Sequence, residues 1–192
     1  MKILLVSGSR NRNGQCALAG NTLLLGAEAS GATTESIFLP ELHIERCRQC
    51  NEDGWGLCAK EGRCIITEDD FYTVFEKVKE ANAVIFATPV YLWEPSESFW
   101  ALGTRMRRLC FKWGKTDTVS EKPVVLVAVA GGGGTGSIRT LFQVEQMMDF
   151  TGFKVVDLWP LQRQNLEGKL PQLELAGKWL VTRHNEKRES KQ

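Results

Sequence analysis

Apolar and polar positions along the chain follow two periods, one typical of buried strands and one typical of helices. Five short runs are almost continuously apolar or β-branched, as in strands buried on both faces of a sheet: residues 2–7, 33–39, 83–88, 123–130 and 154–158. Helical periodicity occurs at residues 16–29, 69–80, 96–113, from near 137, and at 171–184. Residues 67–70 read Thr-Glu-Asp-Asp, which predicts a capping box at the start of the second helix.

Strands that alternate with helices must run parallel, because each connection crosses back over the sheet. The pattern therefore predicts one α/β domain over residues 1–192, with a doubly wound five-stranded sheet covered by helices on both faces. We favour the strand order 2-1-3-4-5. A cysteine-rich insertion is expected at about residues 40–67.

Charge and composition exclude several classes of partner. The net charge is +1, with 43% hydrophobic and 24% charged residues, which gives no reason to expect nucleic acid or an anionic membrane. No apolar stretch approaches the roughly 18 residues that a membrane span needs, and no targeting segment is visible. A cytoplasmic protein is expected, in which disulfides are rare.

The loop after the first predicted strand has the composition of an anion site. Glycine, hydroxyl and amide groups there, with a helix N-terminus behind them, suit a phosphate monoester, although a polar surface turn is the alternative. Arg10 and Arg12 could neutralise charge. The candidate ligand residues are Ser9, Arg10, Asn11, Asn13, Gly14, Gln15 and Cys16.

Two further loops leave carboxyl ends of predicted strands and suit a flat ring. Aromatic side chains after a proline can wall such a ring, and glycines let the backbone approach it. The residues are Pro89, Val90, Tyr91, Leu92 and Trp93 in one loop and Gly131, Gly132, Gly133 and Gly134 in the other. Core packing and a flexible turn are the respective alternatives. Together, the three loops predict a site for a phosphorylated planar cofactor at one edge of the sheet.

Four of the six cysteines lie in one segment with the spacing C-x2-C-x7-C-x5-C: Cys47, Cys50, Cys58 and Cys64. Four thiolates can hold a [4Fe–4S] cluster or, less typically at this spacing, zinc, and bare thiols remain a third interpretation. A cluster in this loop would be expected beside the cofactor. Cys110 stands apart on a predicted helix, where a small buried apolar residue is expected. His43 and His184 are too scattered to form a catalytic array, and no catalytic acid or base is identified.

These motifs resemble the flavodoxin-like NAD(P)H-dependent FMN reductases and iron–sulfur flavoproteins, from residue 1 to about 159. Ser9 and Gly14 match the family's G-S-P-R-x-x-G-N-T, whereas Gln15 and Cys16 replace its last two residues. Residues 88–91 match T-P-x-Y. Ser96 and Arg105 fit the helix that follows, but Trp100 and Thr104 depart from it. Residues 131–134 resemble the family's glycine loop, and the cysteine spacing resembles its cluster motif with residues 51–55 inserted.

The resemblance implies an FMN-dependent oxidoreductase that takes hydride from NAD(P)H and reduces a quinone, flavin or metal acceptor. A non-enzymatic electron carrier is a second hypothesis, although such carriers are usually strongly acidic. A third is a cysteine-loop metal-binding module without flavin. Apolar residues along 96–113 also predict a homodimer or homotetramer, because they form more apolar surface than one sheet face covers: Phe99, Trp100, Leu102, Met106, Leu109, Phe111 and Trp113.

Overall fold

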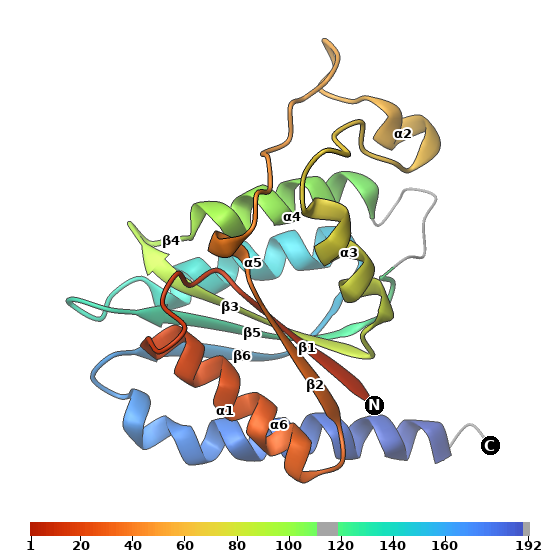
Figure 1. The fold of residues 1–192 in the computed structure, drawn as a ribbon. Coiled ribbons are helices and arrows are strands. Elements are labelled where there is room, and N and C mark those ends of the chain that lie inside the picture. Colours follow the sequence, from red (N-terminus) through yellow and green to blue (C-terminus); the bar gives the residue numbers. More distant parts are fainter. Residues whose placement is uncertain (111–118, 190–192) are drawn as a thin grey trace.

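The computed structural model describes residues 1–110 and 119–189, with side chains described as far as residue 183. Its sheet contains five parallel strands: β1 (Lys2–Ser7), β2 (Thr33–Phe38), β3 (Ala83–Tyr91), β5 (Pro123–Ala130) and β6 (Lys154–Gln162). They lie in the order β2-β1-β3-β5-β6 (Figure 1). The predicted order is therefore confirmed, because β4 (Glu94–Pro95) is only a two-residue antiparallel partner for the end of β3.

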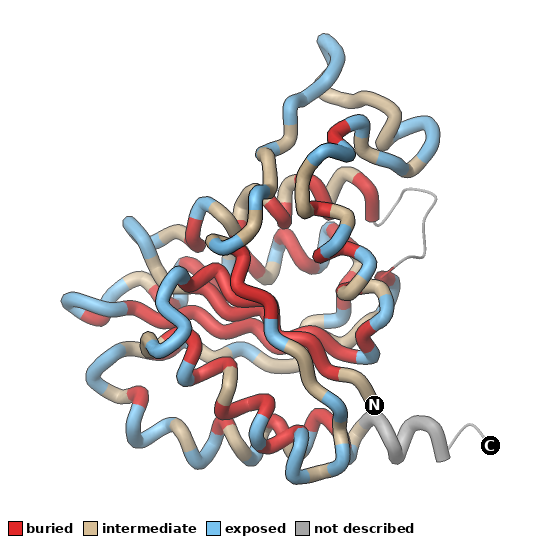
Figure 2. The backbone as a smooth tube through the Cα atoms, viewed as in Figure 1, coloured by how far each residue is buried: buried red, intermediate tan, exposed pale blue. Residues whose placement is uncertain are grey.

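Helices cover both faces of this sheet, as predicted. One face packs against α1 (Gln15–Ala29) and α6 (Leu166–Glu189). The other packs against α3 (Phe71–Glu80), α4 (Glu97–Leu109) and α5 (Ser137–Thr151). Successive β1 residues enter opposite cores, with Leu4 on the α4 side and Leu5 on the α1 side. Figure 2 shows the buried strands at the centre, between these two layers.

Several element boundaries and one helix cap differ from the sequence prediction. β6 runs on to Gln162 instead of ending at residue 158. β3 runs on through Pro89 to Tyr91, because its end pairs with β4 in a hairpin. α6 begins at Leu166 and includes Pro171, since the buried Leu166 side chain anchors an extra turn before the proline. The predicted capping box is wrong: the N-cap residue of α3 is Asp70, whose side chain makes no capping hydrogen bond, and the Phe71 N–H donates to Asp69 Oδ1 at 3.3 Å.

Most of the apolar residues along 96–113 that were expected to form a self-association surface face the core instead. Phe99, Leu102, Met106 and Leu109 are buried within the chain, at 1%, 1%, 0% and 4% exposure. They therefore contribute to the core and leave little apolar surface on α4. Phe111 and Trp113 lie outside the described residues.

Cys110, at the end of α4, is buried as predicted. Burial raises the pKa of its thiol to about 12, which makes it a small apolar residue of the core. Within the described residues, no helix is both long enough and apolar enough to cross a bilayer.

Candidate flavin-binding site and cysteine pocket

The three candidate loops meet around one cavity of about 520 Å³ at the carboxyl ends of the strands. In Figure 1 these loops lie together at the left edge of the sheet. The cavity is lined by Ser9, Gln15, Cys16, Pro89, Val90, Tyr91, Leu92, Trp93, Val129, Ala130, Gly131, Gly132, Gly133, Gly134 and Thr135. Val129, Ala130 and Thr135 were not predicted. They flank the glycine run, so their position beside it is the signal that could have identified them.

The first loop is folded by its own side chains. Ser9 Oγ accepts the Asn11 N–H and donates to the Asn11 carbonyl, both at 3.2 Å. Asn11 Oδ1 in turn accepts the Asn13 N–H at 2.9 Å. Arg10, Asn11, Asn13 and Gly14 do not line the cavity themselves. Asn11 and Asn13 thus shape the turn, whereas Ser9 also reaches the cavity.

The N-terminus of α1 presents unpaired N–H groups at this loop. Gly14 is the N-cap and no side chain caps the helix; the first helical bond runs from the Leu18 N–H to the Gly14 carbonyl at 2.8 Å. Among the described residues, the N–H groups of Gln15 and Cys16 therefore have no acceptor. Both residues line the cavity, so these donors and the helix dipole suit an anion there.

The cavity wall carries no formal charge. Burial raises the pKa of Cys16 to about 12, although a hydrogen bond with Ser7 opposes the shift, so the thiol is neutral at pH 7. None of the described lining residues is Asp, Glu, Lys, Arg or His. Arg12, a candidate for charge neutralisation, instead forms two bonds to Glu41, at 2.6 and 2.5 Å, and its guanidinium lies 4.5 Å from the Phe38 ring centroid. An anion bound here would be held by N–H and hydroxyl groups.

A strained hairpin forms the apolar side of the cavity. Leu92 and Trp93 have positive φ values of 52° and 63°, a conformation that bulky side chains rarely adopt. Their side chains are nevertheless 89% and 50% exposed. At Gly136, whose φ is 93°, an added Cβ would lie 2.3 Å from Trp93 Cδ1. The hairpin therefore depends on this glycine, and its strain is typical of a functional site.

The glycine loop leaves open space opposite the hairpin. An added Cβ at Gly131, Gly132 or Gly133 would meet nothing within 4 Å. Packing inside the chain therefore does not explain why side chains are missing at these positions. The room is available to a ligand, which is the use predicted from the sequence.

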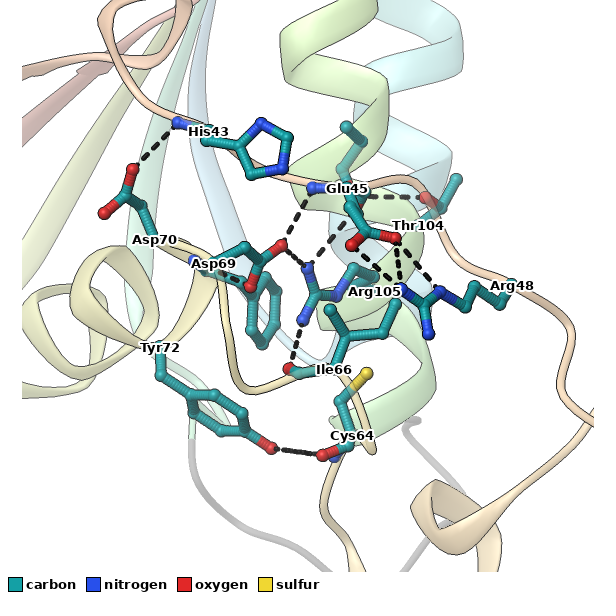
Figure 3. Close-up of polar contacts among 12 residues, drawn as sticks. His43, Glu45, Arg48, Cys64, Ile66, Asp69, Asp70, Tyr72, Thr104 and Arg105 are labelled. Carbon is teal, nitrogen blue, oxygen red and sulfur yellow. Dashed lines mark hydrogen bonds and ion pairs between the residues drawn. The ribbon is translucent and has the colours of Figure 1, made fainter.

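The cysteine-rich segment projects from the body of the protein beyond α4 and includes the short helix α2 (Leu57–Glu61), after the 3₁₀ turn η1 (Leu39–Glu41) (Figure 1). Its two ends are bound together at their base (Figure 3). The N–H groups of His43 and Glu45 donate to carboxylate oxygens of Asp70 and Asp69, both at 2.8 Å. The two acidic residues at the start of α3 therefore bind the opposite end of the segment, and Asp69 Oδ1 also accepts the Phe71 N–H at 3.3 Å.

Arg105 of α4 completes this base. It is 1% exposed, pairs with Asp69, and donates to the carbonyls of Glu45 at 3.3 Å and Ile66 at 2.9 Å. Burial acts to raise the pKa of Asp69, but the hydrogen bonds from Arg105 and the Glu45 N–H outweigh it and lower that pKa. Tyr72 Oη accepts the Cys64 N–H at 2.7 Å and donates to the Cys64 carbonyl at 3.3 Å. Sequence reasoning missed Asp69 and Tyr72; for Arg105, the fit to the family pattern was the only signal.

All four predicted cysteines line one small, mostly apolar pocket of about 20 Å³: Cys47, Cys50, Cys58 and Cys64. Across residues 1–110 and 119–183, however, no three His, Cys, Asp or Glu side chains lie close enough together to hold a metal ion. Four thiols are a suitable donor set for a metal ion or cluster. In the described arrangement they are too far apart, so forming such a site requires the sulfur atoms to move inward. Gly54 and Gly56 give the segment freedom to do so.

The cysteine pocket was expected beside the cavity, but it lies apart from it. Arg105, Arg108 and Leu109 line it, at the C-terminal end of α4, whereas the hairpin that lines the cavity leads into the N-terminal end of α4 at Ser96. The two sites share no lining residue. A helix of 13 residues spans about 20 Å, at about 1.5 Å per residue, and this length separates them.

The fold and the cavity together define a flavodoxin-like α/β protein, with a cavity at the carboxyl edge of a doubly wound sheet, where ligands of such folds bind. The model of the NADPH-dependent FMN reductase family matches residues 1–162, and the chain belongs to that family. By class it is therefore an oxidoreductase.

Individual relatives agree with this assignment. The chain is 27% identical over 159 residues to an iron-sulfur flavoprotein of Methanosarcina thermophila, covering 81% of this chain and 77% of that protein. It is 33% identical over 109 residues to one of Methanocaldococcus jannaschii, covering 57% and 53%. The latter match spans only about half of the relative's length. A solved NAD(P)H:quinone oxidoreductase from Methanothermobacter marburgensis has a TM-score of 0.65 at 16% identity, over 94% and 96% of the two chains. That likeness shows the fold alone.

Proposed function

We propose that the chain binds FMN in the 520 Å³ cavity and transfers reducing equivalents from NAD(P)H to a small-molecule acceptor. The observation that carries the proposal is the convergence of three chemically different loops on this one cavity. FMN supplies the hydride-accepting chemistry when bound, and the chain supplies binding, orientation and electrostatics.

The free N–H groups of Gln15 and Cys16, with Ser9, would hold the phosphate at the N-terminus of α1. The flavin ring would lie between the 89–93 hairpin and the glycine loop. Because Gly131–133 have no side chains and open space above them, the backbone can approach a ring closely there. The residues present therefore fit FMN.

The acceptor we favour is a neutral ring such as a quinone. Tyr91, Leu92 and Trp93 expose 57%, 89% and 50% of their surface at the cavity mouth. Large apolar groups beside an uncharged wall favour an uncharged aromatic acceptor over a charged metal complex or a second flavin phosphate. The near-neutral charge of the chain also argues against a dedicated electron carrier.

Titrating FMN into apoprotein while following flavin fluorescence tests the binding site. We expect quenching, and much weaker binding of riboflavin, since in the proposed site the first loop would contact only the phosphate. No binding up to about 100 μM, which corresponds to about −5.5 kcal/mol, would contradict the proposal. Oxidation of NADH and NADPH by the loaded protein, with quinone, flavin and ferric acceptors compared, then identifies donor and acceptor.

A second candidate function rests on the four cysteines around one pocket. We propose that they hold a metal–thiolate centre, a [4Fe–4S] cluster being favoured over zinc. Anaerobically prepared protein should then contain about four iron and four sulfide per chain. Iron-free protein from an iron-replete preparation would leave zinc or bare thiols.

Self-association as a homodimer or homotetramer stays a prediction, as does a cytoplasmic location. The apolar residues of α4 give less support for self-association than expected, because the described ones are mostly buried in the chain. Light scattering at micromolar concentration should give at least twice the 21.5 kDa chain mass.

A further inference from the structure

Among the described residues, one guanidinium group at the cysteine pocket has no counter-charge within ion-pair distance. Four arginines line this pocket: Arg48, Arg63, Arg105 and Arg108. Three of them form ion pairs, with Glu45, Glu61 and Asp69 respectively. No carboxylate of the described residues lies within ion-pair distance of Arg108. In the described part of the chain its positive charge is therefore unbalanced, and it lies at the pocket wall that the four thiols also line.

Contacts with the cysteine segment hold Arg108 in place. The centre of its guanidinium lies 4.0 Å from the Trp55 ring centroid, and a Cβ on Gly54 would lie 3.5 Å from its Nη2. Its Nε–H is buried and, in the part of the chain that the structure describes, has no hydrogen-bond partner. The Nε–H of Arg105 is in the same condition. Two orphaned donors at one pocket are unusual, because buried polar groups are nearly always paired.

The chemistry of the pocket indicates what would pair them. A metal ion or cluster bound by four thiolates carries net negative charge, and the remaining wall is largely apolar, with Leu57, Ile66 and Leu109. Such a charge is costly to bury without a counter-charge and hydrogen bonds. Thiolate and sulfide sulfur atoms accept hydrogen bonds, and these bonds tune both affinity and reduction potential.

We propose that Arg108 provides the counter-charge, and that Arg108 and Arg105 provide Nε–H donors, for an anionic metal–thiolate centre formed by the four cysteines of the pocket. Arg108 is thus a positioning and charge-compensating residue, and it is not itself a metal ligand. The inference rests on the second candidate function, the metal centre, and is independent of flavin binding.

Cobalt(II) titration of the anaerobic, reduced protein tests this role, with thiolate-to-cobalt absorption as the readout. Arg108→Gln removes both charge and donor, whereas Arg108→Lys keeps the charge and loses the Nε–H. Arg107→Gln is the matched control, because it removes the same charge one residue away on α4 and does not line the pocket. We expect cobalt affinity to fall by about 10- to 100-fold in Arg108→Gln, as for other groups that support metal ligands. Arg108→Lys should be intermediate and Arg107→Gln within about twofold of wild type.

The reduction potential of the iron-reconstituted centre gives a second readout. Losing a nearby positive charge favours the less negative, oxidised state, so the potential of Arg108→Gln should be lower than that of Arg107→Gln. Equal cobalt affinities in Arg108→Gln and Arg107→Gln would overturn the proposed role. A wild-type chain that binds neither cobalt nor iron would overturn this role together with the metal centre. FMN binding by each variant, measured in parallel, shows that it is folded and separates these outcomes from failure of the flavin site.

Discussion

Replacing Gly177 with alanine should destabilise the protein, although alanine is the better helix former. Gly177 lies in α6 where this helix crosses α1. An added Cβ would lie 2.0 Å from the Leu23 carbonyl oxygen and 3.1 Å from the Ala27 nitrogen. Gly26, on the opposite helix, is equally close, with an added Cβ 1.9 Å from the Glu174 oxygen. Since the obstructing atoms are backbone, only a movement of one whole helix relieves the clash.

The expected magnitude follows from two opposing terms. Overpacking a tight core costs about 1–3 kcal/mol, and a backbone clash on this scale favours the upper end. Against this, alanine in a helix is more favourable than glycine by about 1 kcal/mol. The free energy of unfolding should therefore fall by about 2 kcal/mol, which lowers the thermal midpoint by about 4–8 °C in a chain of this size.

Urea unfolding followed by circular dichroism measures this change, and Gly168→Ala is the matched control in the same helix. An added Cβ at Gly168 meets nothing within 4 Å, so this variant should be as stable as wild type or slightly more stable. If Gly177→Ala were as stable as Gly168→Ala, the close crossing of α1 and α6 would be refuted.

Three further predictions concern the sites. Gly133→Leu should weaken FMN binding by at least about tenfold, or about 1.4 kcal/mol, because the new side chain has room only in the cavity. The thermal midpoint of the apoprotein should not fall, and a less stable apoprotein would contradict this prediction. In native, metal-free protein at pH 8, a chromogenic disulfide should label the four loop thiols rapidly. It should spare Cys16 and Cys110, which are buried and have pKa values of about 12. Rapid labelling of either residue, located by mass spectrometry, would contradict their burial. Asp69 has a lowered pKa, so its stabilising contribution is present above the usual Asp pKa of about 3.9 and is lost as pH falls through the lower folded value. Asp69→Asn should therefore reduce stability at pH 7 and lose less of it on acidification than wild type does, as acid-dependent urea unfolding would show.

The sequence by itself determined the layers of the fold and the edge that carries the cavity. Buried parallel strands need apolar residues on both faces, so a run such as residues 123–130 can be recognised as a strand from its own residues. Parallel strands also bring their carboxyl ends to one edge, which is why loops far apart in sequence could be assigned to one cavity. The four cysteines were likewise recognisable from their spacing alone, and the structure places all of them around one pocket.

Only the tertiary structure decided which side chains are free and which are already paired. Arg12 looked available to a phosphate until Glu41, from a distant turn, was seen to bind it. Asp69 had the sequence of a helix cap, yet it pairs with Arg105, 36 residues away. Arg108 was not singled out from the sequence; only the structure places its Nε–H at the thiol pocket, without a hydrogen-bond partner among the described residues. Such pairings depend on contacts between elements distant in the chain, and local sequence periodicity carries no information about them.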